Sequence, residues 1–212
     1  MRPNPLEWVF FDFDGTLADT ERLGIELDQE AYRAFGITPT DEEMRSLAGT
    51  TGEESIPAVF AAHGMRVSAE EFAARRQSCR VIYYDLPLEA SPGAPELIAR
   101  LRGQGVRLAV VSTTIRPWVQ RALARVGLAG SFEFMVCGDD VSRHKPDPEP
   151  YLEALRRAGT QPERALAVED SKSGVASAKA AGIYTIGYRG GSVAQDVSRA
   201  DEIIVSFVGL RL

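Results

Sequence analysis

Cysteine, histidine and lysine are scarce in this chain of 212 residues, and this scarcity excludes several classes of protein. Two cysteines, Cys79 and Cys137, give no disulfide framework and fit a reducing compartment. With only two histidines beside them, a structural zinc site is not expected. No apolar run reaches the length of about 18 residues that a membrane-spanning helix needs, and the N-terminus lacks the apolar stretch of a signal peptide. We therefore expect a cytoplasmic protein.

The charge of the chain is acidic, with a formal net value of -6. This argues against a nucleic-acid partner and against an anionic membrane surface. Lysine occurs only at Lys145, Lys172 and Lys179, so each lysine has diagnostic value. Nothing in the pattern indicates an oligomer, and we expect a monomer.

Short apolar runs rich in β-formers alternate with helical patterns over most of the chain. Strands are expected at residues 8–11, 106–112, 134–137, 166–169, 184–187 and 203–205. The helical segments between them have apolar residues three and four apart, and Gly127, Gly159 and Gly182 stand where helix ends are expected. Strands with little alternation, separated by helices, predict an α/β fold, a Rossmann-like three-layer core with a parallel sheet.

A second region, from about residue 21 to 85, contains no convincing strand and is predicted to form three or four helices. Capping-box patterns mark three helix starts: Thr40 with Glu43, Thr51 with Glu54, and Ser68 with Glu71. The chain is therefore divided into a discontinuous α/β core, residues 1–19 and 88–212, and an inserted helical cap, residues 20–87.

Polar side chains follow several predicted strands. Asp12 and Asp14 follow the first strand, Ser112 and Thr113 the second, and Glu169 and Asp170 the strand at 166–169, with Lys145 in the preceding loop. Ligands of an open parallel sheet gather beyond the carboxyl ends of its strands, so these side chains are expected to converge.

Converging carboxylates repel one another at low dielectric unless a hard divalent cation lies among them, and Mg²⁺ is the cation we expect. An aspartate can also attack phosphorus and form an aspartyl-phosphate. Asp12 is the expected nucleophile and Asp14 the general acid and base. Ser112, Thr113 and Lys145 are assigned to the phosphate. The pair Asp12 and Asp14 is assigned to the metal, together with Asp170 and Glu169.

The motifs "DFDGTLADT", "VVST", "KPDP" and "VEDSKSG" together resemble the haloacid dehalogenase superfamily of phosphohydrolases, in their order and rough spacing. The helical insertion after the first motif resembles the cap of the subgroup that holds β-phosphoglucomutase and phosphoglycolate phosphatase. The resemblance implies the same roles for these residues as those inferred above from their chemistry. It adds that Asp14 binds the metal through its backbone carbonyl.

Departures from relatives narrow the expected reaction. Dehalogenases lack the second aspartate, so Asp14 argues against carbon–halogen cleavage. Phosphonatases use a cap lysine, and residues 20–88 contain none. β-Phosphoglucomutase needs a cap histidine and a cap arginine, whereas the matching positions here are Gly24 and Gly52. We therefore expect a phosphatase and keep the mutase as the alternative.

The substrate is expected to be a small phosphorylated metabolite, such as a sugar, sugar-alcohol or hydroxy-acid phosphate. Candidate contacts to it are Glu21, Thr50, Thr51, Arg80 and Arg116. A phospho-accepting signalling module is a more distant alternative, because strand-end aspartates with a hydroxyl and a lysine occur there too. Asp14 argues against it, since a positioned base shortens the life of an acyl-phosphate.

Overall fold

A computed structural model describes residues 1–47, 53–193 and 195–212. The chain divides into two compact units. The core unit comprises Met1–Glu21 and Pro87–Leu212, and the helical unit comprises Arg22–Leu86. These bounds lie within two residues of the predicted ones, and the role of the helical unit as a lid stays a prediction.

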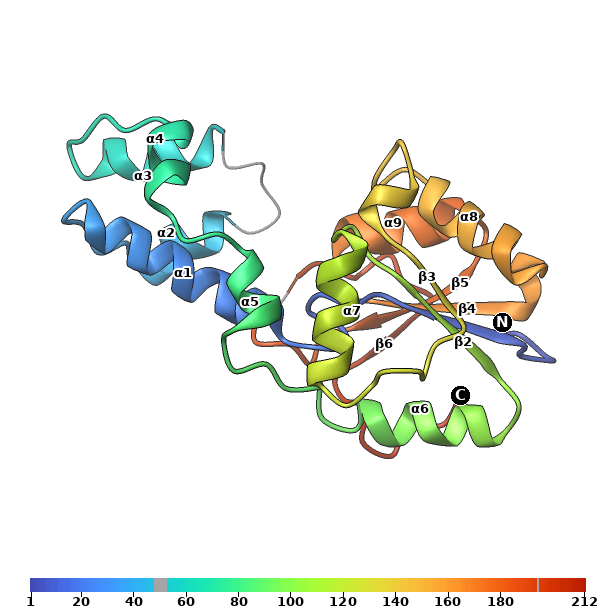
Figure 1. The fold of residues 1–212 in the computed structure, drawn as a ribbon. Coiled ribbons are helices and arrows are strands. Elements are labelled where there is room, and N and C mark those ends of the chain that lie inside the picture. Colours follow the sequence, from blue (N-terminus) through green and yellow to red (C-terminus); the bar gives the residue numbers. More distant parts are fainter. Residues whose placement is uncertain (48–52, 194) are drawn as a thin grey trace. The chain divides into compact units, whose positions relative to one another are not determined.

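The core unit is built on a parallel sheet with the strand order β3-β2-β1-β4-β5-β6 (Figure 1). Its strands are β1 (Trp8–Phe11), β2 (Arg107–Val111), β3 (Phe134–Val136), β4 (Ala165–Glu169), β5 (Tyr184–Tyr188) and β6 (Glu202–Ile204). The ends of all six predicted strands lie within one residue of those observed. The predicted α/β fold class is confirmed.

The strand β1 lies in the middle of the sheet, between β2 and β4. All four of its side chains are buried, because neighbouring strands cover its edges and helices cover the sheet faces. This explains why the sequence "WVFF" is continuously apolar instead of alternating.

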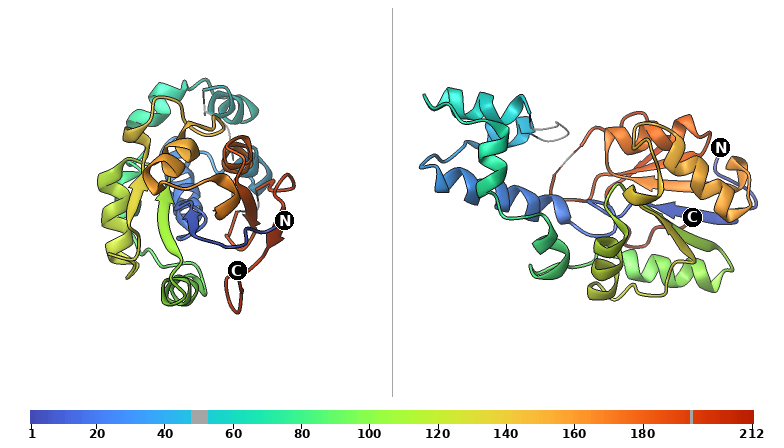
Figure 2. Two further views of the ribbon diagram at one scale, coloured as in Figure 1. Left: turned by 90° about the vertical axis from the view of Figure 1, so that its right-hand side faces the viewer. Right: turned by 45° about the horizontal axis from the view of Figure 1, so that its top comes forward.

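Helices cover both faces of the sheet. The helices of the core unit after β1 are α6 (Ala94–Gly103), α7 (Arg116–Arg125), α8 (Glu149–Ala158) and α9 (Lys172–Ala180), with short 3₁₀ turns η1 (Gly138–Asp140) and η2 (Pro162–Arg164). Figures 1 and 2 show α8 and α9 together on one face and α6 on the other. Tyr151 of α8 packs with Trp8 and Phe10 in the apolar core beneath α8 and α9. Gly159 ends α8 in the left-handed conformation, as predicted.

The helical unit has an apolar core of its own. The helices of this unit are α1 (Thr20–Ala34, which begins in the core unit), α2 (Asp41–Leu47), α3 (Ser55–Ala62), α4 (Ala69–Arg75) and α5 (Arg80–Tyr84). The ring centroids of Tyr32 and Phe72 lie 4.5 Å apart, and those of Tyr32 and Phe60 lie 5.1 Å apart. Since these rings come from three helices, they join α1, α3 and α4 into one unit.

Two of the three predicted capping boxes are confirmed. At the start of α2, the Glu43 N–H donates to Thr40 Oγ1 at 3.2 Å, and the Thr40 N–H donates to Glu43 Oε2 at 2.7 Å. Ser68 and Glu71 form the same reciprocal pair at the start of α4. Thr51 lies outside the described residues. None of the helices in the described part of the chain is long and apolar enough to cross a membrane.

Candidate active site

Three carboxylates are buried together at the carboxyl ends of β1 and β4. Asp12 follows β1, Glu169 ends β4, and Asp170 comes next; their exposed fractions are 6%, 0% and 6%. One oxygen from each lies within 4.8 Å of the others. The parallel pairing of β1 with β4 sets Phe11 opposite Val168, which brings Asp12 level with Glu169.

Lys145 enters the same cluster from the loop before α8. Its Nζ lies 2.7 Å from Asp12 Oδ1, 2.6 Å from Glu169 Oε1 and 2.8 Å from the carbonyl oxygen of Val111. Only 4% of the side chain is exposed, so this ammonium is a buried cation held by two carboxylates.

The electrostatics of the cluster are unbalanced, because three carboxylates surround one ammonium. Burial raises the pKa of Asp12 to about 8, and the charges of Glu169 and Asp14 add to the rise while Lys145 opposes it. Burial, together with the charges of Asp12 and Glu169, raises the pKa of Asp170 to about 9. Burial disfavours the charged form of Lys145, but the carboxylates outweigh this effect and raise its pKa.

The donor set fits a hard divalent cation. The three clustered side chains offer carboxylate oxygens, which Mg²⁺ and Ca²⁺ prefer. Asp12 Oδ2 and Glu169 Oε2 are buried and have no hydrogen-bond partner within the described part of the chain. Buried, unpaired carboxylate oxygens are costly, and a cation would remove that cost together with the excess negative charge.

Two glycines leave the space that these carboxylates occupy. A Cβ on Gly174 of α9 would lie 1.8 Å from Glu169 Oε2, and a Cβ on Gly15 would lie 2.1 Å from Asp170 Oδ2. Gly15 also has a φ of 77°, which disfavours other residues. The glycines of "DFDG" and "DSKSG" are thus steric requirements of the acidic cluster.

Asp14 is half-buried and lies outside this cluster of three carboxylates. Three hydroxyls donate to its carboxylate: Thr20 Oγ1 to Oδ1 at 2.9 Å, Ser112 Oγ to Oδ2 at 3.2 Å, and Thr114 Oγ1 to Oδ2 at 2.8 Å. Ser112, predicted to bind phosphate, therefore contacts Asp14 in this structure. Thr113 is exposed, and its carbonyl would lie 2.2 Å from a Cβ on Gly138.

The predicted substrate contacts in or near the helical unit are only partly described. Thr50 and Thr51 lie outside the described residues. Arg80 is exposed; its guanidinium stacks 4.0 Å from the centroid of the Tyr84 ring and lies 4.0 Å from Asp85. Its contacts are local to α5, and its role in binding substrate stays a prediction.

The other two predicted substrate contacts belong to the core unit. Glu21 is half-buried, and its charge contributes to the raised pKa of Asp170, after burial and the two nearer carboxylates. The Arg116 guanidinium donates to Asp140 Oδ2 at 2.5 Å and to the Met135 carbonyl at 3.1 Å. These contacts tie α7 to β3 and to the segment after it, so they favour a structural role for Arg116.

A family model described as haloacid dehalogenase-like hydrolase matches residues 9–188, which hold every residue of the cluster just described. The chain belongs to this family. The resemblance stated from the motifs is therefore confirmed.

Several proteins similar to this haloacid dehalogenase-like hydrolase are named as phosphatases. One from Thermotoga maritima, named phosphorylated carbohydrates phosphatase, is 35% identical over 85% of this chain and 84% of its own. One from Streptomyces hygroscopicus, named validoxylamine A 7'-phosphate phosphatase, is 31% identical over 96% of this chain and 95% of its own. The crystal structure of a putative β-phosphoglucomutase from Thermotoga maritima superposes with a TM-score of 0.76 at 32% identity, covering 94% of both chains.

Residues to which the sequence assigned no catalytic or binding role also support this site, although Thr20 lies within the motif "DFDGTLADT" and Thr114 directly follows "VVST". The Tyr151 hydroxyl donates to Glu169 Oε1 at 2.6 Å, and Tyr151 is fully buried. Thr20 and Thr114 hold Asp14. In the sequence, the position of Tyr151 on the apolar face of a predicted helix could have indicated such a contact, since a buried phenol needs a hydrogen-bond partner.

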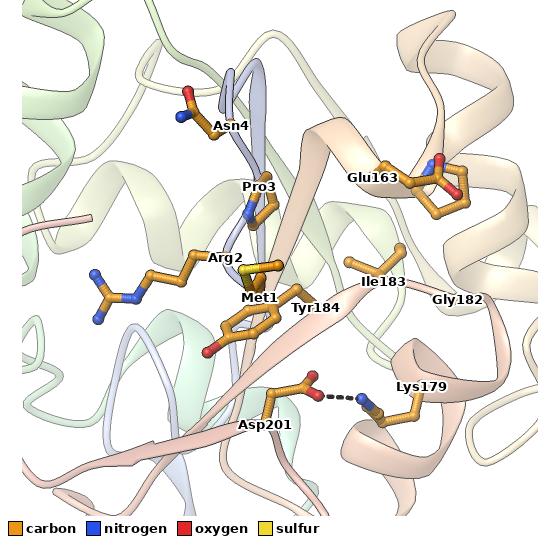
Figure 3. A pocket seen from close by; sticks show the side chains of 11 residues that line it. Met1, Arg2, Pro3, Asn4, Glu163, Lys179, Gly182, Ile183, Tyr184 and Asp201 are labelled. Atoms are coloured by element: carbon orange, nitrogen blue, oxygen red, sulfur yellow. Dashed lines mark hydrogen bonds and ion pairs between the residues drawn. The ribbon is translucent and has the colours of Figure 1, made fainter.

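A hollow of about 280 Å³ lies elsewhere on this hydrolase, where the N-terminal residues meet the start of β5 (Figure 3). None of the predicted site residues that the structure describes lines it. Lys179 and Asp201, which do, pair with each other at 2.5 Å. The hollow is therefore separate from the candidate active site.

Proposed function

We propose that this protein is a Mg²⁺-dependent phosphatase that hydrolyses a small phosphate monoester through an aspartyl-phosphate. The main support for the proposal is the environment of Asp12. Its Oδ1 is bound by Lys145, and its Oδ2 is buried among further carboxylates with no hydrogen-bond partner from the described residues. The names of the phosphatases that the chain resembles support the same reaction class.

Asp12 is the nucleophile in this proposal. One of its oxygens forms a bond to phosphorus while the bond from phosphorus to the ester oxygen breaks, which leaves an alcohol and an acyl-phosphate on Asp12. Water then attacks the phosphorus, releases inorganic phosphate and restores the carboxylate.

Asp14 supplies and removes the protons. It gives a proton to the leaving alkoxide in the first step and takes one from the attacking water in the second. The hydroxyls of Thr20 and Thr114 hold its two oxygens in place during these steps.

Asp12, Glu169 and Asp170 would hold Mg²⁺, with the backbone carbonyl of Asp14 as the further ligand that the family resemblance implies. When bound, the ion supplies positive charge to the phosphoryl oxygens. Lys145, Ser112 and Thr113 are the proposed phosphate donors. Because Lys145 and Ser112 now contact carboxylates, each must exchange a partner when phosphate binds.

The helical unit, residues 20–87 by the sequence boundaries, is the proposed lid over a sugar, sugar-alcohol or hydroxy-acid phosphate. The proposal of a carbohydrate-like substrate is supported by the name of the Thermotoga maritima phosphatase. A panel of phosphate esters ranked by kcat/KM would identify the preferred one.

The test of the nucleophile is Asp12→Asn, assayed with p-nitrophenyl phosphate and Mg²⁺. We expect turnover to be abolished, whereas the surface variant Asp196→Asn should retain wild-type turnover. Wild-type turnover in Asp12→Asn would refute the assignment, and a wild-type protein that releases no phosphate from any ester in the panel would refute the phosphatase.

The alternative is a sugar phosphomutase, favoured by the structural similarity to a putative β-phosphoglucomutase. Gly24 and Gly52, where the sequence comparison expects a histidine and an arginine, weigh against it. Incubation with β-glucose 1-phosphate and α-glucose 1,6-bisphosphate distinguishes the two, because a mutase forms glucose 6-phosphate and a phosphatase releases inorganic phosphate.

A further inference from the structure

Glu169 is a fully buried carboxylate whose hydrogen bonds are concentrated on one oxygen. Oε1 accepts from the Tyr151 hydroxyl at 2.6 Å and lies 2.6 Å from Lys145 Nζ. The other oxygen, Oε2, has no hydrogen-bond partner in residues 1–47, 53–193 and 195–212. Two donors therefore share a single acceptor atom.

The Lys145 ammonium has three N–H groups and three acceptors within 2.8 Å: Asp12 Oδ1, Glu169 Oε1 and the Val111 carbonyl. An ammonium donates three hydrogen bonds and accepts none. A phosphoryl oxygen can thus be bound by Lys145 only if one of these acceptors is released.

Of the two carboxylates among these acceptors, Glu169 can be released at the lower cost. Among the described residues, Glu169 Oε1 has a second donor, whereas Asp12 Oδ1 is bound by Lys145 alone. A buried carboxylate that loses its last hydrogen bond carries a large desolvation penalty. The Tyr151 hydroxyl removes this penalty from Glu169.

We propose that Tyr151 is a positioning residue whose hydroxyl holds Glu169 when Lys145 transfers an N–H to a phosphoryl oxygen. This inference rests on the proposed function, because it requires that phosphate binds beside Asp12. In this proposal, Lys145 at one end of the segment 145–151 binds phosphate, and Tyr151 at the other end keeps the Glu169 carboxylate in place.

The surroundings of Tyr151 suit this task. The side chain is fully buried in the core beneath α8, so the hydroxyl is held at a fixed position. Lys145 Nζ lies 5.6 Å from the centroid of its ring, close enough for the ring to attract the ammonium while its partners change. Burial and the charge of Glu169 raise the pKa of Tyr151 well above its usual range, so the phenol remains a donor.

The test compares Tyr151→Phe with the matched variant Tyr184→Phe. The Tyr184 hydroxyl also donates to a glutamate, Glu202 Oε2, at 3.4 Å. Tyr184 is the first residue of β5, so this pair lies at the edge of the sheet opposite the carboxylate cluster. Calorimetry gives the dissociation constant of inorganic phosphate with excess Mg²⁺, and separately that of Mg²⁺ without phosphate. Steady-state kinetics with p-nitrophenyl phosphate give KM and kcat.

For Tyr151→Phe we expect phosphate affinity to fall about tenfold or more, since a hydrogen bond to a charged group is lost in the bound state. KM should rise in parallel, while kcat and the Mg²⁺ affinity without phosphate stay within about twofold, because Lys145 still holds Glu169 there. Tyr184→Phe should match the wild type in all four quantities.

Phosphate affinity in Tyr151→Phe within about twofold of wild type would overturn the inference. An equal fall in Mg²⁺ affinity without phosphate would also overturn it, because it would show a merely structural role. A wild-type protein that binds no phosphate in Mg²⁺ would instead overturn the proposed function, and this inference with it.

Discussion

Gly174→Ala is the sharpest test of how the acidic cluster is built. Gly174 is the third residue of α9, and an alanine Cβ there would lie 1.8 Å from Glu169 Oε2 and 2.4 Å from Oε1. Both distances are far below van der Waals contact. Since β4 and α9 fix the two backbones, the Glu169 carboxylate must move.

The magnitude follows from three opposing effects. Alanine is favoured over glycine inside a helix by about 0.5–1 kcal/mol. Overpacking a buried site costs about 1–3 kcal/mol, and displacing Glu169 weakens its bonds to Tyr151 and Lys145, worth about 1.5–3 kcal/mol each when intact. We expect a net loss of about 2 kcal/mol in the free energy of unfolding, or about 4–8 °C in Tm for a chain of this size.

The matched control is Gly103→Ala at the end of α6, where a Cβ would meet nothing within 4 Å. There the helix propensity acts alone, so stability should rise by up to about 1 kcal/mol. Urea unfolding with and without Mg²⁺ measures both variants. Wild type should gain about 2.7 kcal/mol at a Mg²⁺ concentration of 100 Kd, and Gly174→Ala should gain far less. Wild-type stability with a full Mg²⁺ response in Gly174→Ala would refute the reasoning.

Three further predictions concern single side chains. Arg116→Ala should lose about 1–2 kcal/mol of stability with KM unchanged, because the guanidinium bonds Asp140; a raised KM at wild-type Tm would contradict this. Thr114→Val should lower kcat about tenfold by loosening Asp14, with wild-type Tm expected and wild-type kcat contradicting it. Burial raises the pKa of Cys137 to about 12, so its thiolate fraction grows with pH only in strongly alkaline solution. Ellman's reagent should therefore titrate one native thiol rapidly at pH 8 and two in urea; two rapid native thiols would contradict the burial.

The sequence predicts the strands well because a parallel sheet buried on both faces needs continuous apolar runs. It also predicts that carboxylates gather, because all parallel strands end at one edge of the sheet. It could not say that Asp12 and Glu169 are direct neighbours. That fact depends on the pairing of β1 with β4, which are separated by more than 150 residues of chain and brought together by tertiary packing.

The roles of the Thr20, Thr114 and Tyr151 hydroxyls escaped prediction for a different reason. Threonine and tyrosine have ordinary roles in strand ends and helix cores, and no spacing rule distinguishes Thr114 from a loop threonine. Tyr151 fits the apolar face of α8 as well as a phenylalanine would. What marks it is the need of a buried phenol for an acceptor, and that acceptor, Glu169, becomes visible only in the folded protein.

The two aspartates that flank Phe13 differ in the kind of partner they have, and this difference supports the roles proposed for them. Asp12 is bound by Lys145, which can only donate hydrogen bonds and therefore favours an ionised carboxylate, the form that attacks phosphorus. Asp14 is bound by hydroxyls, including those of Thr20 and Thr114, which can donate to a carboxylate and accept from a carboxylic acid. Such partners suit a group that gains and loses a proton in each cycle. Replacing Thr20 by valine should therefore impair the protonation steps more than phosphate binding, seen as a lower kcat with an unchanged dissociation constant for inorganic phosphate; weaker phosphate binding at wild-type kcat would contradict this division of roles.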